Sequence, residues 1–229
     1  MATQDIHTAE ILNQSKSGNF MFAPVGNSCN VQIFEELNMK SCAELISHLN
    51  LVISQLPLKK PIDTSSIQLT TPYDVSPDTF VFDVAICCSG GEFPAYKSLS
   101  SMFAQAKARG AIVRTVVTGN ASSSASMLAI QGTPGYRIMF EQAYNLVHYG
   151  TSAASGRAND ELLADAKKRI KEREIVFDVY KKFTKLTAKE IRKFTDKDKI
   201  GKLFAPFCLS RGLCDWILTQ DGYFVGRSK

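Results

Sequence analysis

Two apolar runs, each closed by a turn of small residues, constrain the fold of this 229-residue chain most strongly. Residues 80–88 are almost continuously apolar and end at Ser-Gly-Gly, and residues 111–117 end at a turn that carries Gly119 and several serines. Such runs are typical of strands buried on both faces of a sheet. Because helical patterns at 96–109 and 124–131 follow the two runs, the sequence predicts an α/β protein built around a parallel sheet.

The rest of the chain continues this alternation of strands and helices. An apolar stripe predicts a helix over residues 41–56, with Ser41 as its cap. Thr187 and Glu190 have the spacing of a capping box at the start of a short helix that ends near residue 195. The other expected elements are strands at 19–23, 136–140 and 144–148, a further element at 31–37, and a long helix at 159–185.

The domain organisation is simple. We expect a flexible N-terminal arm over residues 1–18 and a single domain over residues 19–229. Within that domain, residues 57–77 are rich in Pro, Thr, Ser and Lys, and they form a connector that is long for a compact domain. The polar start of the chain, with Asp5 and Glu10, is neither a signal peptide nor a membrane span, so we expect no membrane partner.

Composition narrows the class of protein. Apolar residues make up 45% of the chain and charged residues 21%, an ordinary balance for a soluble globular protein. Much of the net charge of +5 lies between residues 167 and 202, where aromatic residues are not interleaved with the basic ones. We therefore interpret this segment as a solvated helical face and expect no nucleic-acid partner.

The six cysteines point to the compartment rather than to a metal site. No pair has Cys-x-x-Cys spacing, and Cys87 and Cys88 lie inside an apolar run. We expect buried, reduced thiols, a reducing compartment such as the cytoplasm, and neither a metal site nor a cofactor.

The two small-residue turns are also the best candidates for chemistry. Ligands of parallel α/β sheets bind beyond the carboxyl ends of the strands, where Gly90, Gly91 and the turn at 119–124 are expected to lie. Their backbone N–H groups could converge on one oxyanion, or the glycines could simply permit tight turns. A serine in the second turn needs a base to become a nucleophile, and His148 is the candidate base among three histidines.

The order of these segments resembles the Clp protease proteolytic subunit family of the crotonase-like superfamily. Ser89-Gly-Gly91 matches the family's Gly-Gly turn, and Gly119-Asn-Ala-Ser-Ser-Ser124 looks like its nucleophile segment. Leu146-Val-His148 occupies the place of the histidine segment, and Thr195-Asp-Lys-Asp198 is similar to the aspartate segment. The resemblance runs from about residue 80 to 218.

Two later segments extend the resemblance. Ser155-Gly-Arg-Ala-Asn-Asp160 is similar to the start of the family's protruding handle helix, so residues 149–195 form the expected handle region. Ala205-Pro206 and Gly212-Leu-Cys-Asp215 resemble the family's terminal signature. The implied fold is the family's repeated β-β-α unit with a parallel sheet.

The resemblance implies a role for each site residue. Ser123 is the nucleophile, His148 the general base, and Asp198 the carboxylate that orients the imidazole, with Asp196 as the alternative. The N–H groups of Gly91 and Ser124 form the oxyanion hole. The residues expected to bind substrate, partly through strand addition, are Gly90, Tyr149, Gly150 and Thr151.

The implied function is that of a serine endopeptidase. It cleaves unfolded polypeptides inside a homo-oligomer of stacked heptameric rings, which is supplied by an AAA+ unfoldase in the cytoplasm, or in a host cytoplasm if the protein is viral. Three alternatives stay open: a catalytically inactive ring or scaffold subunit, an ATPase-independent maturation protease, and a hydratase or thioesterase of the crotonase group. The crowded serines fit a divergent, phage-encoded or accessory homologue.

Overall fold

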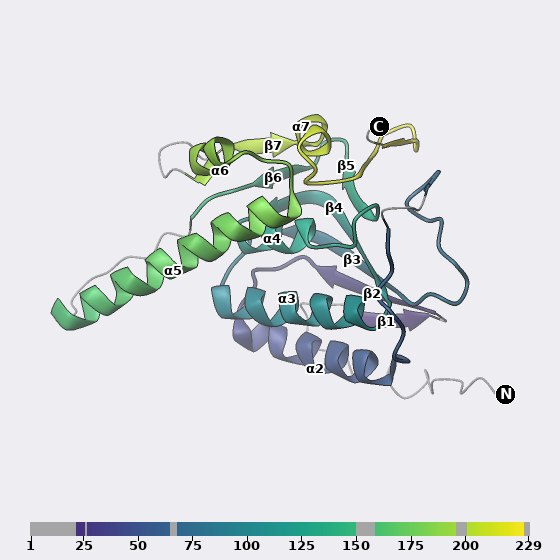
Figure 1. Ribbon diagram of the computed structural model, residues 1–229, viewed down its shortest axis with the longest axis horizontal. Helices are drawn as coiled ribbons and strands as arrows, with labels where there is room; N and C mark the ends of the chain where they lie inside the picture. The colour runs from purple at the N-terminus through teal and green to yellow at the C-terminus, as the bar shows by residue number, and fades with distance from the viewer. Residues whose placement is uncertain (1–21, 26, 65–67, 150–158, 196–200, 227–229) are drawn as a thin grey trace.

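The computed structural model describes residues 22–25, 27–64, 68–149, 159–195 and 201–226, and its centre is a nine-stranded, mostly parallel sheet (Figure 1). This arrangement confirms the α/β class and the parallel sheet predicted from the alternating apolar patterns. The strands in sheet order are β1 (Phe22–Val25), β2 (Ser28–Ile33), β3 (Val81–Cys88), β4 (Ile112–Ser122), β5 (Arg137–Phe140), β8 (Trp216–Leu218) and β9 (Phe224–Gly226). The first pair, β1 with β2, and the last pair, β8 with β9, are antiparallel.

One long strand organises the sheet. The first half of β4 pairs with β5, and its last three residues pair in parallel with β6 (Tyr144–Leu146). On its other side β6 pairs with the antiparallel strand β7 (Lys202–Phe204). The strands predicted at 136–140 and 144–148 correspond to β5 and the shorter β6, whereas sequence patterns did not predict β7, β8, β9 or the six-residue helix α7 (Ala205–Ser210).

The remaining helices are α2 (Met39–Gln55), α3 (Phe93–Ala108), α4 (Ser124–Ile130), α5 (Asn159–Phe183) and α6 (Ala188–Thr195), and α2 and α3 lie side by side (Figure 1). The cap predicted for the first of these is wrong. Helix α2 begins at Met39, and its cap is Asn38, whose side chain accepts a hydrogen bond from the N–H of Ser41 at 2.8 Å. The capping box of α6 is confirmed, because Glu190 Oε2 accepts from the N–H of Thr187 at 2.8 Å and Thr187 Oγ1 accepts from the N–H of Glu190 at 3.2 Å.

The sheet is covered more fully on one face than on the other. Along β3, Val84, Ile86 and Cys88 are buried, whereas the alternating residues Asp83, Ala85 and Cys87 are half-buried. The expectation that this strand is buried on both faces is therefore wrong. The six cysteines are free thiols, and all except the half-buried Cys87 are buried, as expected. No helix in the described part of the chain is long and apolar enough to cross a membrane.

The described residues of the connector, 57–64 and 68–77, contain no helix or strand and pack near the start of β4. Arg114 of β4 pairs with Asp83 and donates to the carbonyl oxygen of Pro72 at 2.9 Å. The Arg114 guanidinium also lies 4.3 Å from the centre of the Tyr73 ring. The connector is thus anchored at the amino end of β4, away from the turns that close β3 and β4.

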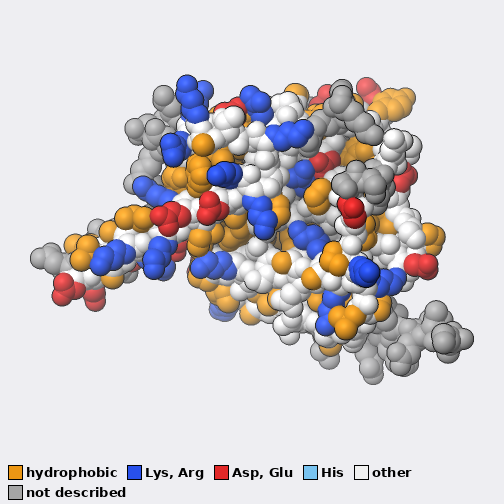
Figure 2. Space-filling view, in the orientation of Figure 1, with side chains coloured by type: hydrophobic (Ala, Val, Ile, Leu, Met, Phe, Trp, Pro, Cys, Tyr) orange, Lys and Arg blue, Asp and Glu red, His pale blue; other side chains and the backbone are white. Residues whose placement is uncertain are grey.

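Helix α5 leaves the body of the molecule (Figure 1). Val176 and Tyr180 in its second half are buried, and the Tyr180 hydroxyl donates to Ser126 Oγ of α4 at 2.9 Å. Farther along the projection, Leu163 and Ile170 are more than half exposed. Figure 2 shows apolar, basic and acidic side chains mixed along this projecting helix. Its second half therefore holds α5 to the body, and its first half presents apolar side chains to the outside.

Candidate active site

Ser123 occupies a strained turn between β4 and α4. Its backbone has φ 54° and ψ −124°, and it is the one non-glycine residue with positive φ in the described part of the chain. A side chain in such a region costs on the order of 1–3 kcal/mol and is held there by its surroundings. Here the N–H of Ser123 donates to the carbonyl oxygen of Leu146 at 2.8 Å, and its own carbonyl accepts from Met127 at 3.2 Å. This strand–strained serine–helix arrangement is the geometry of a nucleophile turn.

The neighbouring serines are engaged elsewhere. Ser124 and Ser126 are buried, and their hydroxyls are hydrogen-bonded to Gly91 and Tyr180 respectively. Ser122 ends β4, and its hydroxyl accepts from the Asn120 side chain at 3.3 Å. The Ser123 hydroxyl, in contrast, makes no hydrogen bond with any described residue. Ser123 and Ser124 both line a pocket, but the Ser124 hydroxyl is already bound to Gly91. Of the crowded serines, Ser123 is therefore the one placed to meet a ligand.

The Ser-Gly-Gly turn after β3 packs directly against the serine turn. Gly90 and Gly91 have φ values of 101° and 141°, which favour glycine. A Cβ at Gly90 would lie 2.6 Å from the carbonyl oxygen of Ser122, and a Cβ at Gly91 would lie 2.1 Å from that of Leu37. The absence of side chains thus permits both the tight turn and its close approach to Ser123. The same geometry also leaves room for the turn's backbone N–H groups beside Ser123, so the two alternatives for these glycines do not exclude each other.

Gly91 and Ser124 are joined at the mouth of the pocket. The Ser124 hydroxyl donates to the carbonyl oxygen of Gly91 at 2.9 Å. Leu37 forms a parallel bridge with Gly91: the N–H of Leu37 donates to the carbonyl oxygen of Gly90 at 2.7 Å, and the N–H of Glu92 donates to the carbonyl oxygen of Leu37 at 2.6 Å. The Gly91 N–H takes no part in this bridge. Ser124 is the first residue of α4, where an N–H has no partner within the helix. Two backbone donors are therefore available beside Ser123.

A buried thiol braces the same turn from behind. Cys88 Sγ donates to the carbonyl oxygen of Glu35 at 2.8 Å and accepts from the N–H of Gly90 at 3.3 Å. Burial raises the pKa of this thiol, which keeps it in the neutral form that can donate. Gly90 itself is buried behind the turn, so its predicted contact with substrate stays a prediction.

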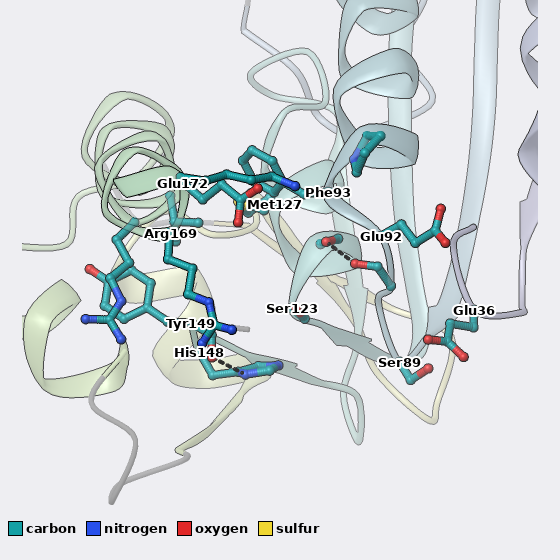
Figure 3. Close-up of a pocket in the computed structure, with 16 residues that line it drawn as sticks. Glu36, Ser89, Glu92, Phe93, Ser123, Met127, His148, Tyr149, Arg169 and Glu172 are labelled. Atoms are coloured by element: carbon teal, nitrogen blue, oxygen red, sulfur yellow. Dashed lines mark hydrogen bonds between the residues drawn. The ribbon is translucent and has the colours of Figure 1, made fainter. Parts of the chain in front are cut away.

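His148 lies on the pocket lining with Ser123, two residues beyond the end of β6. Its Nδ1 is 3.0 Å from the carbonyl oxygen of Tyr149 (Figure 3). Because a carbonyl oxygen can only accept, this hydrogen bond places the proton on Nδ1 and leaves Nε2 of the neutral ring free to act as a base. No hydrogen bond joins His148 to Ser123 among the described residues.

The other predicted site residues are divided between the pocket and the undescribed segments. Tyr149 lines the pocket. Gly150, Thr151, Asp196 and Asp198 lie outside the described residues, so their roles stay predictions. Among the residues that are described, no group of three or more His, Cys, Asp or Glu side chains could hold a metal ion.

The pocket has a volume of about 590 Å³ and includes residues that the sequence patterns did not single out. Apolar side chains come from three helices, and charged ones come mainly from α5. These residues are Phe93, Met127, Val176, Glu36, Glu92, Lys168, Arg169, Glu172 and Arg173. The helical spacing of Arg169, Arg173 and Val176 places them on one face of α5. This spacing could have indicated a buried or ligand-facing side of the helix, but the composition of the basic segment instead predicts a wholly solvated face.

Comparison with known proteins gives a consistent result. The family model for Clp protease matches residues 74–221. The chain is 26% identical over 183 residues to ATP-dependent Clp protease proteolytic subunit 1 of Nocardia farcinica, covering 78% of this chain and 89% of that protein. It is 30% identical over 152 residues to ATP-dependent Clp protease proteolytic subunit 2 of Streptomyces coelicolor, covering 66% of this chain and 67% of that protein. The matched residues include Ser123, His148 and both turns.

Proposed function

Since this chain belongs to the Clp protease family of serine peptidases, we propose that it hydrolyses peptide bonds in unfolded polypeptides with Ser123 as the nucleophile. The observation that carries the proposal is the strained backbone of Ser123, which presents its hydroxyl to a pocket shared with His148. Strain of this kind persists where function requires it and the surroundings enforce it.

The chemistry follows from the groups at the pocket. Ser123 Oγ attacks the scissile carbonyl while Nε2 of His148 takes the hydroxyl proton, which then passes to the leaving amine and leaves an acyl-serine ester. A water molecule, deprotonated by the same Nε2, attacks this ester and releases the new carboxyl terminus, and the proton returns to Ser123 Oγ. The N–H groups of Gly91 and Ser124 donate to the tetrahedral oxyanion, and each such donor contributes about 3 kcal/mol to the transition state. The substrate backbone pairs with the segment from Tyr149 to Thr151 as an added strand. The apo arrangement tightens when substrate binds.

We assign the orienting carboxylate to Asp198, which accepts the Nδ1–H of His148 in the active arrangement in place of the Tyr149 carbonyl. The proposal is supported by the antiparallel pairing of β6 and β7, in which Lys202 lies opposite Leu146. Lys202, four residues after Asp198 in the sequence, therefore lies at the end of β6 from which the chain continues to His148. Asp198→Asn should lower kcat by about 10³–10⁴-fold, as loss of the orienting group does in serine proteases. Asp196→Asn is the matched control and should retain turnover; a loss confined to Asp196→Asn would move the role to that residue.

The proposed active form is a homo-oligomer of stacked heptameric rings that receives substrate from a separate AAA+ unfoldase. Two observations support this: the exposed apolar residues on the projecting half of α5, and the ATP dependence in the names of both relatives. An isolated helical projection gains little stability without a packing partner. Light scattering should give a mass many times the 25.2 kDa of one chain, and a stable monomer would contradict the assembly.

A peptidase assay tests the reaction itself. The wild-type protein should cleave an unfolded polypeptide and a fluorogenic peptide, and Ser123→Ala should abolish both activities while the oligomer stays intact. Ser122→Ala is the matched control, because its hydroxyl is bound within β4, and it should retain turnover. Full activity in Ser123→Ala would refute the assignment.

A further inference from the structure

The pocket at Ser123 has two walls of opposite charge. Helix α5 contributes Lys168, Arg169 and Arg173 together with one acid, Glu172. The facing side carries two carboxylates and no cation among its described lining residues. Figure 3 shows Arg169 and Glu172 on one side of Ser123, and Glu36 and Glu92 on the other.

The acidic wall is fixed to the Ser-Gly-Gly turn. Glu36 and Glu92 adjoin Leu37 and Gly91, the two residues that form the parallel bridge. Glu92 Oε2 also accepts from the N–H of Met39 at 2.9 Å, which holds this carboxylate at the start of α2. The Glu92 carboxylate is therefore held beside the candidate oxyanion donors, while Glu36 extends an exposed carboxylate from the residue before Leu37.

The basic wall is held less tightly but keeps a net positive charge. Arg173 lies with its guanidinium 5.2 Å from the centre of the Tyr149 ring, next to His148. Arg169 is 3.6 Å from Asp165, one turn earlier on the helix. The pocket lining from α5 thus carries three positively charged residues, Lys168, Arg169 and Arg173, and one negatively charged residue, Glu172.

Apolar side chains also line the pocket. Figure 3 shows Phe93 of α3 and Met127 of α4 between α5 and Glu92, and Val176 of α5 adds to the lining. A chain that crosses the pocket from one wall to the other thus meets positive charge, apolar surface and negative charge in turn. Opposite charges on a bound segment would be attracted in one orientation and repelled in the other.

We propose that this site selects polypeptide segments in which an acidic and a basic side chain flank an apolar residue in one order. The acidic side chain faces α5, and the basic one faces Glu36 and Glu92. This inference rests on one part of the proposed function, namely that polypeptides bind in the pocket, and it does not require that they are cleaved there. Because most of the charged wall residues are solvent-exposed, namely Lys168, Arg173, Glu36 and Glu92, each pairing should change affinity about two- to fivefold, and high salt should weaken the effect.

Two labelled peptides of identical composition test the proposal. They carry Asp and Lys on either side of the same apolar core, in opposite orders. Their affinities are measured by fluorescence anisotropy on full-length Ser123→Ala protein at low salt. We expect one order to bind about fivefold more tightly and the difference to shrink in 1 M salt. Equal affinities would overturn the proposal.

Charge reversal locates the effect. Lys168→Glu and Glu36→Lys, combined in one chain, should abolish or invert the preference. The matched control pairs Lys171→Glu with Glu35→Lys, which are exposed neighbours outside the pocket lining, and it should keep the preference. A preference unchanged by the pocket pair would also overturn the proposal. Binding needs no turnover, so failure of the wild-type protein to cleave would contradict the proposed function alone.

Discussion

A Cβ atom added at Gly90 would lie 2.7 Å from the Cβ of Ser123, so the turn after β3 and the turn after β4 are in direct contact. Atoms at that separation overlap, and neither turn can move away freely. The backbone of Ser123 is strained, and Leu146 binds its N–H from the next strand. The position of Ser123 therefore depends on a residue 33 positions earlier having no side chain.

Gly90→Ala should destabilise the protein and reduce peptidase activity by more than tenfold, because the new methyl group displaces Ser123. Gly222→Ala is the matched control: it also places alanine at positive φ, at 82°, but no atom lies within 4 Å of its Cβ. The control should show only the backbone cost of about 1 kcal/mol. Urea unfolding of both variants separates the two contributions, and equal losses would argue against contact with Ser123 as the cause.

Ser124→Ala should lower kcat by about fivefold and leave KM within about twofold, because the hydroxyl that fixes the Gly91 carbonyl is lost and a net hydrogen bond contributes about 1 kcal/mol. Steady-state kinetics on a fluorogenic peptide gives both constants. Ser126→Ala provides the comparison, since it removes the partner of the buried Tyr180 hydroxyl and should cost stability without changing kcat. A normal kcat in Ser124→Ala would exclude a positioning role for its hydroxyl.

Lys107 should make stability depend on alkaline pH. Its Nζ donates to the carbonyl oxygen of Gln131 at 2.6 Å, and burial, with Arg137 and Lys182 nearby, lowers its pKa to about 8. Between pH 8 and the ordinary lysine pKa of 10.5, the unfolded chain holds a proton that the folded protein has released. The contribution of Lys107 to the free energy of unfolding should therefore rise with pH across that window.

Urea unfolding of wild-type and Lys107→Met proteins at pH 7.5 and 9.5 measures this effect. The difference between the two proteins cancels the titration of other groups, such as Cys208, whose pKa burial raises to about 11. The stability of the wild-type protein relative to the variant should increase at the higher pH. A relative stability that stays constant or falls would contradict the lowered pKa.

The sequence patterns identified much of the site because apolar runs and small-residue turns are local signals. Residues 80–88 became β3, and residues 111–117 became the first half of β4. The turn predicted at 119–124 is wrong for residues 119–122, which continue β4, so the turn that meets Gly90 is confined to Ser123 and the start of α4. The cap of α2 was misplaced because Asn38 and Ser41 are both good caps, and the pattern alone does not choose between them.

The charged walls of the pocket escaped prediction for a different reason. Whether a basic residue on α5 faces solvent or the pocket depends on where the helix docks. Docking is fixed by Val176 and Tyr180, and the hydrogen bond from Tyr180 to Ser126 reaches a residue 54 positions away. A contact between residues so far apart in the sequence produces no periodic pattern around Lys168 and Arg173 from which their orientation could be predicted.

Covalent labelling with a fluorophosphonate probe, followed by peptide mass spectrometry, tests directly whether Ser123 is an activated nucleophile. The proposed function predicts one adduct, on Ser123, which is retained in Ser122→Ala and Ser126→Ala and lost in Ser123→Ala. An adduct on a different serine, or no adduct on the assembled wild-type protein, would contradict it, and the second result would favour a non-catalytic ring subunit.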